Sequence, residues 1–418
     1  MNNIRGQGIF VLLFQKAPFW LIMSAFVCVM PPAVADPTLG SSMPFSGLNG
    51  SMGQEVKTGI SIGLQRYQNQ YHIPLNISYK DDAYEPKKTA KNIREMIEKE
   101  HIIGMINNVG TPTAVVSAKI ALQEKLPLYA PISGSDFLRP PAEDPSFRYI
   151  INYRSSYEEE VIRVFNELMA VAPFSSHDLV LFSQDNTIGY GGANWLDHLL
   201  QQHLHEANPQ YLKVSYDRDA TLVENAVADL LMVTPTPKYI FLIASGKPAA
   251  KFVRLVRHYG LDPVFIGISF VGTSTFANSL KDVDARVFIT RVVPPLEQTD
   301  LPIVQEFLAD KKTFLATLPK NQQDTVTPSA LMFESYISTR ILIKALEKEP
   351  YINQYNLIDA LESLGEFDLG LGSPLRLDTT HHQASHSVWL TYLKNGQYIP
   401  IEFTDMGQLL SAGPHHEK

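Results

Sequence analysis

Strand-like and helix-like patterns alternate along most of this 418-residue chain. Leu75, Ile77 and Tyr79 alternate with polar neighbours, as in a half-buried strand, and Val56 and Ile60 begin a pattern with helical spacing. Further apolar runs of strand length occur at 102–106, 126–130, 179–182, 239–244 and 264–266. Helical patterns follow most of these runs, at about 113–123, 194–204, 249–259 and 275–280. This order predicts an α/β fold, with parallel sheets covered by helices on both faces.

The length of the chain predicts two domains, because a single hydrophobic core rarely grows beyond about 250–300 residues. The change of domain is expected near 149–154, where an extended apolar segment follows the turn-rich residues 140–145. Long helical patterns return beyond residue 290. The tail from Ser387 to Phe403 predicts a β-hairpin around Asn395-Gly396, a favoured two-residue turn.

The first residues predict a cleaved signal peptide. Arg5 and Lys16 precede an apolar run at 17–30, and Ala33-Val34-Ala35 has the small-x-small pattern of a signal-peptidase site. We expect cleavage after Ala35. A membrane anchor is the alternative, but it needs about 20 apolar residues, whereas this run is shorter and ends at Pro31-Pro32. The segment therefore predicts a secreted protein.

Cysteine usage and charge exclude further classes of protein. The only cysteine, Cys28, lies inside this segment, and Val27 stands where a lipoprotein signal has a small residue. After cleavage no cysteine remains for a disulfide or a thiolate zinc site. The formal net charge of −8 is spread along the chain, which argues against a nucleic-acid partner.

Three small, hydroxylated loops follow predicted strands in the first half of the chain, at 43–53, 108–113 and 130–136. In parallel sheets, ligands bind outside the carboxyl ends of the strands, where loop backbone and helix starts offer free N–H groups. These loops therefore predict one shared binding site.

Catalytic patterns are sparse. Asp81-Asp82 is best interpreted as a solvated or capping pair, because adjacent strand residues point to opposite faces and do not share a proton. His381-His382 and His415-His416 lack further ligands at metal-site spacing. We expect neither an enzyme nor a metal or cofactor.

Seven motifs, in order along the chain, carry a family resemblance. They are Met-Pro-Phe-Ser-Gly at 43–47, Lys-Asp-Asp-Ala-Tyr-Glu-Pro at 80–86, Gly-Thr-Pro-Thr at 110–113, Tyr-Ala-Pro at 129–131, Gln-Asp-Asn at 184–186, Ser-Phe-Val-Gly at 269–272 and Phe-Asp-Leu-Gly-Leu-Gly at 367–372. Across nearly all of the chain after residue 35, the sequence resembles type I periplasmic solute-binding proteins. More narrowly, it is similar to the branched-chain amino acid (Leu/Ile/Val) binding proteins of ABC importers.

The resemblance implies two doubly wound parallel-sheet lobes, joined by a three-strand hinge, that close on a small molecule. The crossings would fall near 149–154, 288–292 and 364–372. The N-terminal lobe would then comprise 36–152 plus 291–368, and the C-terminal lobe 153–290 plus 369–418.

The resemblance also implies where a ligand carboxylate would bind: at the Thr111 hydroxyl and at the loop of Ile132, Ser133 and Gly134. Such a site gains from the helix dipole and from charge-assisted hydrogen bonds. Alternatively, Thr111 and Ser135 act only as N-caps. We favour the ligand role for Thr111 and the cap for Ser135.

On the second lobe the sequence departs from the amino-acid binders, which place an acid at the position of Ser269 to pair with the ligand ammonium. Either Asp185 or Glu158 supplies that charge here, or the ligand has no α-ammonium, because an unpaired buried ammonium is costly. Without a substitute acid, leucine, isoleucine and valine are expected to bind poorly.

Other pocket positions depart as well. Ile188 and Met52 stand where relatives often carry aromatic residues, and Tyr157 is expected either to form a wall of the site or to pack on the hinge. Tyr84 and Gly110 occupy positions at which some relatives carry a cysteine pair.

The resemblance thus implies the periplasmic substrate-binding component of an ABC importer, a monomer that captures an amino acid, amide or small carboxylate and delivers it to an inner-membrane permease. The alternative is a periplasmic sensing module that docks on a chemoreceptor or signalling partner. Neighbouring permease and ATPase genes would distinguish the two.

Overall fold

The computed structural model describes residues 36–71, 75–218, 220–324 and 326–411. The expected signal peptide with Cys28, and His415-His416, lie outside the described residues. No helix among the described residues is both long enough and apolar enough to span a membrane.

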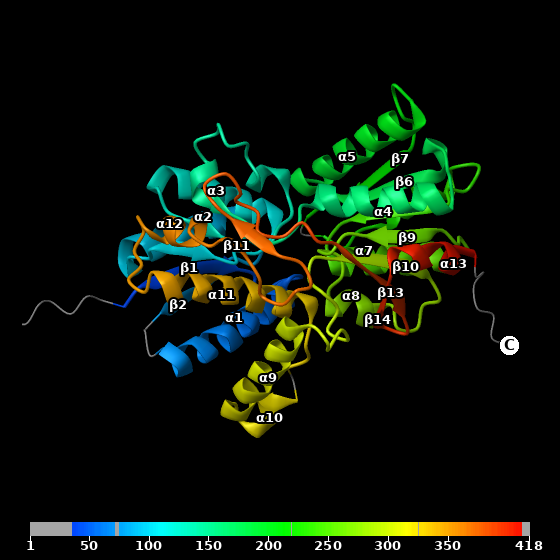
Figure 1. Cartoon of the computed structure of the whole chain (residues 1–418). Helices are drawn as coiled ribbons and strands as arrows, with labels where there is room; N and C mark the ends of the chain where they lie inside the picture. The colour runs from blue at the N-terminus through cyan, green and yellow to red at the C-terminus, as the bar shows by residue number, and fades with distance from the viewer. Residues whose placement is uncertain (1–35, 72–74, 219, 325, 412–418) are drawn as a thin grey trace, which may run out of the picture. The chain divides into compact units, whose positions relative to one another are not determined.

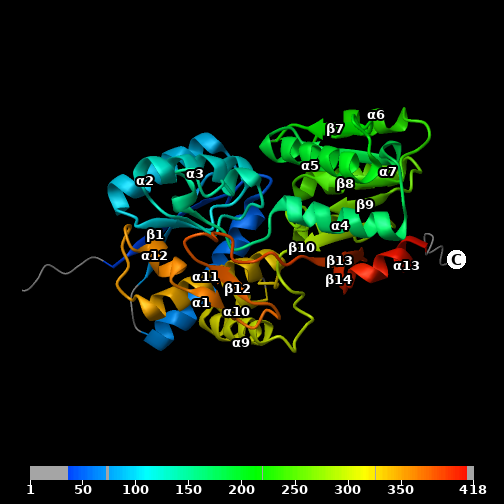
Figure 2. The same ribbon diagram turned by 45° about the horizontal axis from the view of Figure 1, so that its top comes forward.

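The first lobe is built on a parallel five-stranded sheet with the order β2-β1-β3-β4-β5. Its strands are β1 (Thr38–Met43), β2 (Asn76–Asp81), β3 (Gly104–Ile106), β4 (Leu128–Tyr129) and β5 (Ile150–Ile151). Its helices are α1 (Gly50–Tyr71), α2 (Pro86–Glu100), α3 (Thr111–Glu124), α9 (Pro302–Thr317), α10 (Lys320–Gln323), α11 (Ala330–Lys348) and α12 (Leu357–Glu362). Figures 1 and 2 show α2 and α3 over one face of this sheet and α1 with α11 over the other.

The second lobe is built on a seven-stranded sheet with the order β14-β13-β10-β9-β8-β6-β7. Its strands are β6 (Leu179–Gln184), β7 (Leu212–Tyr216), β8 (Tyr239–Ile243), β9 (Val264–Gly267), β10 (Arg286–Arg291), β13 (Trp389–Lys394) and β14 (Gln397–Ile401). Its helices are α4 (Tyr157–Val171), α5 (Thr187–Leu204), α6 (Glu224–Leu231), α7 (Gly246–His258), α8 (Ser274–Ser279) and α13 (Met406–Ser411). Every residue of β6 and β8 is buried, as expected of central parallel strands that have helices on both faces.

The two sheets confirm the predicted α/β class with two parallel-sheet lobes. The hairpin around Asn395-Gly396 is also confirmed, because β13 and β14 pair antiparallel across that turn. Helix α5 begins at Thr187, earlier than the apolar pattern at 194 indicated, because the Asn186 side chain caps it. The sequence patterns did not identify β7 and α6.

Three segments connect the sheets. The first follows β5, and the second leads from β10 to α9 and α11, which pack on α1. The expected third crossing at 364–372 falls instead within a small antiparallel pair, β11 (Gly365–Phe367) and β12 (Leu375–Leu377). The chain enters the seven-stranded sheet only at β13, after Ala384 and Ser385 have bonded to Asn152 and Tyr153 of the first connection.

Candidate functional site

The structure brings the two predicted carboxylate-binding loops together. Thr111 is the first residue of α3, and Ser133 lies in the loop after β4. Their hydroxyl oxygens are 2.8 Å apart, and both side chains are fully buried. Because β3 and β4 are neighbours in a parallel sheet, their carboxyl ends lie side by side, and a bridge between Val109 and Ile132 extends the pairing into the loops.

The backbone N–H groups of this loop are not all available to a ligand. The Ile132 N–H donates to Asn108 O at 2.9 Å, and the Ser133 N–H donates to Pro131 O at 2.9 Å. Across the described residues, the Gly134 N–H has no backbone acceptor, but it lies against the Tyr157 hydroxyl, so a ligand would have to replace that contact. The expected contribution from Ile132, Ser133 and Gly134 therefore reduces to the N–H of Gly134 and the hydroxyl of Ser133.

Thr111 does not cap its helix. The N-cap of α3 is Gly110, which has no side chain to offer, so the capping interpretation of Thr111 is wrong. Ser135 does occupy the N-cap position of the short 3₁₀ helix at Asp136–Leu138, but its side chain makes no capping bond. Instead, the Ser135 N–H donates to the Ser133 hydroxyl at 3.3 Å.

Tyr157 joins the two lobes at this point. It begins α4, where Ser156 and Glu159 form a reciprocal capping box, and its N–H donates to Gly134 O at 2.8 Å. A Cβ on Gly134 would lie 2.7 Å from the Tyr157 nitrogen, so only glycine allows this approach. Burial raises the pKa of the Tyr157 hydroxyl, against the opposing effects of Arg154 and Thr111.

Aromatic rings fill the space between the lobes beside this loop. Tyr84, from the β2–α2 loop, stacks on Phe270, from the loop after β9, with ring centroids 6.4 Å apart. Tyr157 meets the same Phe270 ring edge-on at 6.4 Å. The Tyr84 ring also lies against Gly110, where an added Cβ would be 2.1 Å from a ring carbon. Thus the two positions that carry cysteines in some relatives contact each other here as a tyrosine and a glycine.

Three buried polar groups near these rings make no well-formed hydrogen bond among the described residues: the hydroxyls of Tyr84 and Tyr157, and the side-chain nitrogen of Gln184. Their polar neighbours include one another, with Gln184 beside Tyr84, and Thr111 and the Gly134 N–H beside Tyr157. Burial raises the pKa of Tyr84 well above its usual value, with smaller effects from Tyr157 and Tyr216. Gln184 ends β6 in the second lobe, and its oxygen accepts from Tyr216 at 3.0 Å. Because a buried unpaired polar group is costly, both lobes offer hydrogen-bonding capacity to a bound solute.

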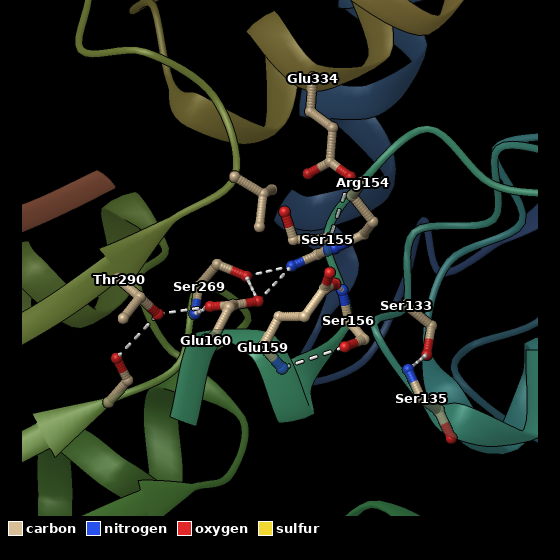
Figure 3. Close-up of polar contacts among 12 residues, drawn as sticks. Ser133, Ser135, Arg154, Ser155, Ser156, Glu159, Glu160, Ser269, Thr290 and Glu334 are labelled. Atoms are coloured by element: carbon tan, nitrogen blue, oxygen red, sulfur yellow. Dashed lines mark hydrogen bonds and ion pairs between the residues drawn. The ribbon is translucent and has the colours of Figure 1, made fainter. Parts of the chain in front are cut away.

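Ser269 lies in a buried charge network (Figure 3). Its N–H and hydroxyl donate to the Glu160 carboxylate at 2.6 and 2.8 Å, and the Thr290 hydroxyl donates to the same carboxylate. The Arg154 guanidinium is 3.2 Å from Glu160 and also donates to the Ser269 hydroxyl. An acid does therefore reach the Ser269 position, but an internal guanidinium and three further donors already occupy it.

Glu334 completes this network from α11 of the first lobe. Its carboxylate is 3.5 Å from the Arg154 guanidinium, and both residues are at most 3% exposed. Burial raises the pKa of Glu334 despite the opposing effect of Arg154. Burial alone would lower the pKa of Arg154, but Glu334, Tyr157 and Glu160 together raise it. Arg154 thus holds one carboxylate from each lobe.

Neither proposed substitute acid reaches Ser269. Asp185 is exposed and accepts a hydrogen bond from Tyr190 at 2.9 Å. Glu158 is half-buried. Burial and the nearby Asp136 raise its pKa, and His198 opposes the rise. Glu160 is the acid that reaches Ser269, and the sequence analysis missed it. The periodicity of α4 contains the signal, since Tyr157, Glu160, Val161, Val164 and Leu168 share its buried face.

The remaining predicted residues lie elsewhere. Met52 and Ile188 are 2% and 1% exposed and belong to the hydrophobic core. The histidines His381 and His382 have separate partners, Asp378 and Glu362, at 2.9 and 2.8 Å. No group of acids, histidines and cysteines in the described part of the chain has the arrangement of a metal site.

Thr111→Ala tests the predicted carboxylate site. We expect a carboxylate ligand to lose about 1.5–3 kcal/mol of binding free energy, the contribution of a hydrogen bond to a charged group. Titration calorimetry measures the affinity. The matched control is Thr113→Ala on the same helix, whose buried hydroxyl donates to Gly110 O at 2.8 Å; it should lower stability and leave affinity unchanged. Equal affinities in Thr111→Ala and the parent would refute the role.

Residues 37–397 match the periplasmic binding protein family. A solved structure of a possible leucine/isoleucine/valine-binding protein from Rhodopirellula baltica SH 1 is 30% identical, with a TM-score of 0.81 over 90% of this chain and 98% of that one. A substrate-binding periplasmic protein from Ralstonia solanacearum is 21% identical, with a TM-score of 0.76 over 88% of this chain and 100% of its own.

More distant structures share the fold alone. A branched-chain amino acid ABC transporter protein from Thermus thermophilus with bound valine is 14% identical, with a TM-score of 0.70 over 88% of this chain and 95% of its own. No curated protein matches the chain.

Proposed function

Because this chain belongs to the periplasmic binding protein family, we propose that it is the periplasmic substrate-binding component of an ABC importer, capturing a small polar solute between its two lobes. The observation that carries this proposal is the set of buried polar groups, from both lobes, that make no well-formed hydrogen bond among the described residues: the hydroxyls of Tyr84 and Tyr157, and the amide nitrogen of Gln184. A solute held there satisfies groups that otherwise cost free energy. Its class is an amino acid, an amide or a small carboxylate.

Residues 1–35 act as the export signal, and the mature protein is a periplasmic monomer without enzymatic activity. The lobes built on the five-stranded and the seven-stranded sheet move about the hinge and close on the solute, and the closed form docks on an inner-membrane permease. Tyr84 and Phe270, one from each lobe, separate when the lobes open and re-form their stack on closure.

The proposal predicts that the cognate solute raises the melting temperature of the protein comprising residues 36–418. At a free concentration 100 times its Kd, a solute stabilises the folded state by about 2.7 kcal/mol. A thermal-shift screen of amino acids, amides and small carboxylates measures this, and mass spectrometry of the denatured protein identifies any solute that co-purifies. The absence of both a concentration-dependent shift and a co-purified solute would contradict the proposal.

A further inference from the structure

A cavity of about 650 Å³ lies beside the Ser269 network, between residues of both lobes. Asn278 and Tyr398 line it from the second lobe, and Thr327 and Ser329 line it from the segment that leads into α11. The volume falls in the range of about 300–1,000 Å³ that is typical of small-molecule sites. The cavity is thus large enough for a solute of the size proposed above.

A small chamber adjoins the cavity. Gly272, Arg291, Ser329 and Ala330 line both spaces. The chamber offers about 10 Å³, which is enough for one water-sized group. Its walls include Ser269 and four charged side chains, namely Glu55, Arg154, Arg291 and Glu334.

The charges around the chamber do not balance. Arg154 is compensated by Glu160, which is hydrogen-bonded on both of its oxygens. Arg291 makes no ion pair with Glu55 within the described residues; its guanidinium donates to Gly272 O at 2.6 Å, and its charge favours the ionised form of Glu55, whose carboxylate accepts from Ser329 at 2.6 Å.

Two guanidinium groups, Arg154 and Arg291, therefore face three carboxylates, Glu55, Glu160 and Glu334, and Glu334 is the one with the fewest donors. Among the described residues its one ion pair is with Arg154, at 3.5 Å, the more distant Arg139 acts on it electrostatically, and no hydrogen bond to its carboxylate is formed. The Nε of Arg154 is likewise buried without a partner. An under-compensated buried carboxylate is costly, and either a proton or a cation removes that cost.

We propose that this chamber takes the ammonium head of a primary amine, with the Glu334 carboxylate as its acceptor, while the rest of the solute occupies the 650 Å³ cavity. An ammonium group matches the chamber in size and supplies the missing positive charge. The outer walls include Val293, Leu296 and Ile399, which suit an apolar chain behind the head. The proposal goes beyond the proposed function, because Tyr84, Tyr157 and Gln184 line neither the chamber nor the cavity; it assigns a second solute site, at which α11 supplies the acid.

The test compares three solutes that share one branched carbon skeleton. Leucine carries both an ammonium and a carboxylate, 3-methylbutylamine carries only the ammonium, and 4-methylpentanoate carries only the carboxylate. Calorimetry on the protein comprising residues 36–418 should show tighter binding of the two amines. In Glu334→Gln the affinity for both amines should fall at least about tenfold, as expected when one partner of a buried charge pair is lost, while the affinity for 4-methylpentanoate stays unchanged.

Two further variants keep the result interpretable. Glu366→Gln changes an exposed acid on β11 and should bind all three solutes as the parent does. Glu334→Asp retains the charge, so it should retain the preference for amines if Glu334→Gln fails to fold. Putrescine and agmatine, each paired with its deaminated analogue, extend the comparison to longer amines.

The outcomes separate the inference from the proposed function. The inference is overturned if Glu334→Gln binds amines as tightly as the parent, which is the result expected of a carboxyl group that simply holds its own proton. It is also overturned if the parent prefers the deaminated member of every pair, and in both cases the solute-binding function stands. If no solute of the broad thermal-shift panel binds, the proposed function itself fails.

Discussion

Replacing Arg154 by methionine will lower the free energy of unfolding by about 3–5 kcal/mol, the cost of leaving a buried carboxylate without its partner. Arg154 is 1% exposed and is the cation that faces both Glu160 and Glu334. Methionine fills much of the same volume but carries no charge. Urea denaturation at neutral pH, followed by circular dichroism, measures the change.

The matched control is Arg254→Met, which breaks an exposed pair with Asp282 at 2.7 Å. Exposed pairs contribute about 0–1 kcal/mol, so the two variants should differ several-fold. The double variant Arg154→Met with Glu334→Gln should recover part of the loss, because it leaves one unpaired carboxylate instead of two. A loss in Arg154→Met no larger than in Arg254→Met would show that the network does not stabilise the fold.

The second large effect concerns pH and Asp82. This carboxylate is fully buried and accepts from Ser42, Thr89 and the Tyr84 N–H at 2.8, 3.0 and 2.9 Å. Burial raises its pKa to about 6 from an ordinary value of 3.8, and these hydrogen bonds only partly oppose the rise. The native state therefore binds the proton more tightly than the unfolded state does, so stability is present below about pH 4 and is lost as the pH rises towards 6.

Asp82→Asn removes this titration and keeps a side chain that the two hydroxyls can still bond. Relative to the parent, the variant should gain stability between about pH 4 and 6, by about 3 kcal/mol for a shift of about two pKa units, with no further gain above that. Urea unfolding curves at a series of pH values measure the difference.

The adjacent Asp81 provides a control of opposite sign. It is exposed, and hydrogen bonds from Ser46, Phe45 and Ala83 lower its pKa although partial burial opposes them. Its contribution is therefore present above its unfolded pKa and lost as the pH falls, so Asp81→Asn should be less stable than the parent at neutral pH. If both variants shift stability in the same direction, the assigned roles are wrong.

Much of the fold was predictable because its signals are local. Continuous apolar runs became the buried strands β6 and β8, and Asn395-Gly396 formed the expected hairpin because its turn chemistry involves only neighbouring residues. The proximity of Thr111 and Ser133 was also predictable, since carboxyl ends of adjacent parallel strands meet at one edge of a sheet. The sequence analysis missed β7 and α6, whose apolar residues do alternate with the expected periods but over only five and eight residues.

The sequence by itself therefore determined the α/β class, the order of most elements and the loops at which the site is built. Only the tertiary structure decided which charged and aromatic groups meet. Arg154 joins Glu160 to Glu334, 180 positions away along the chain, and Tyr84 stacks on Phe270. Periodicity reports which face of an element is buried, but it carries no information about the partner that covers that face. The charge balance at Ser269 depends on which residues of the two lobes contact each other, and only the tertiary structure shows these contacts.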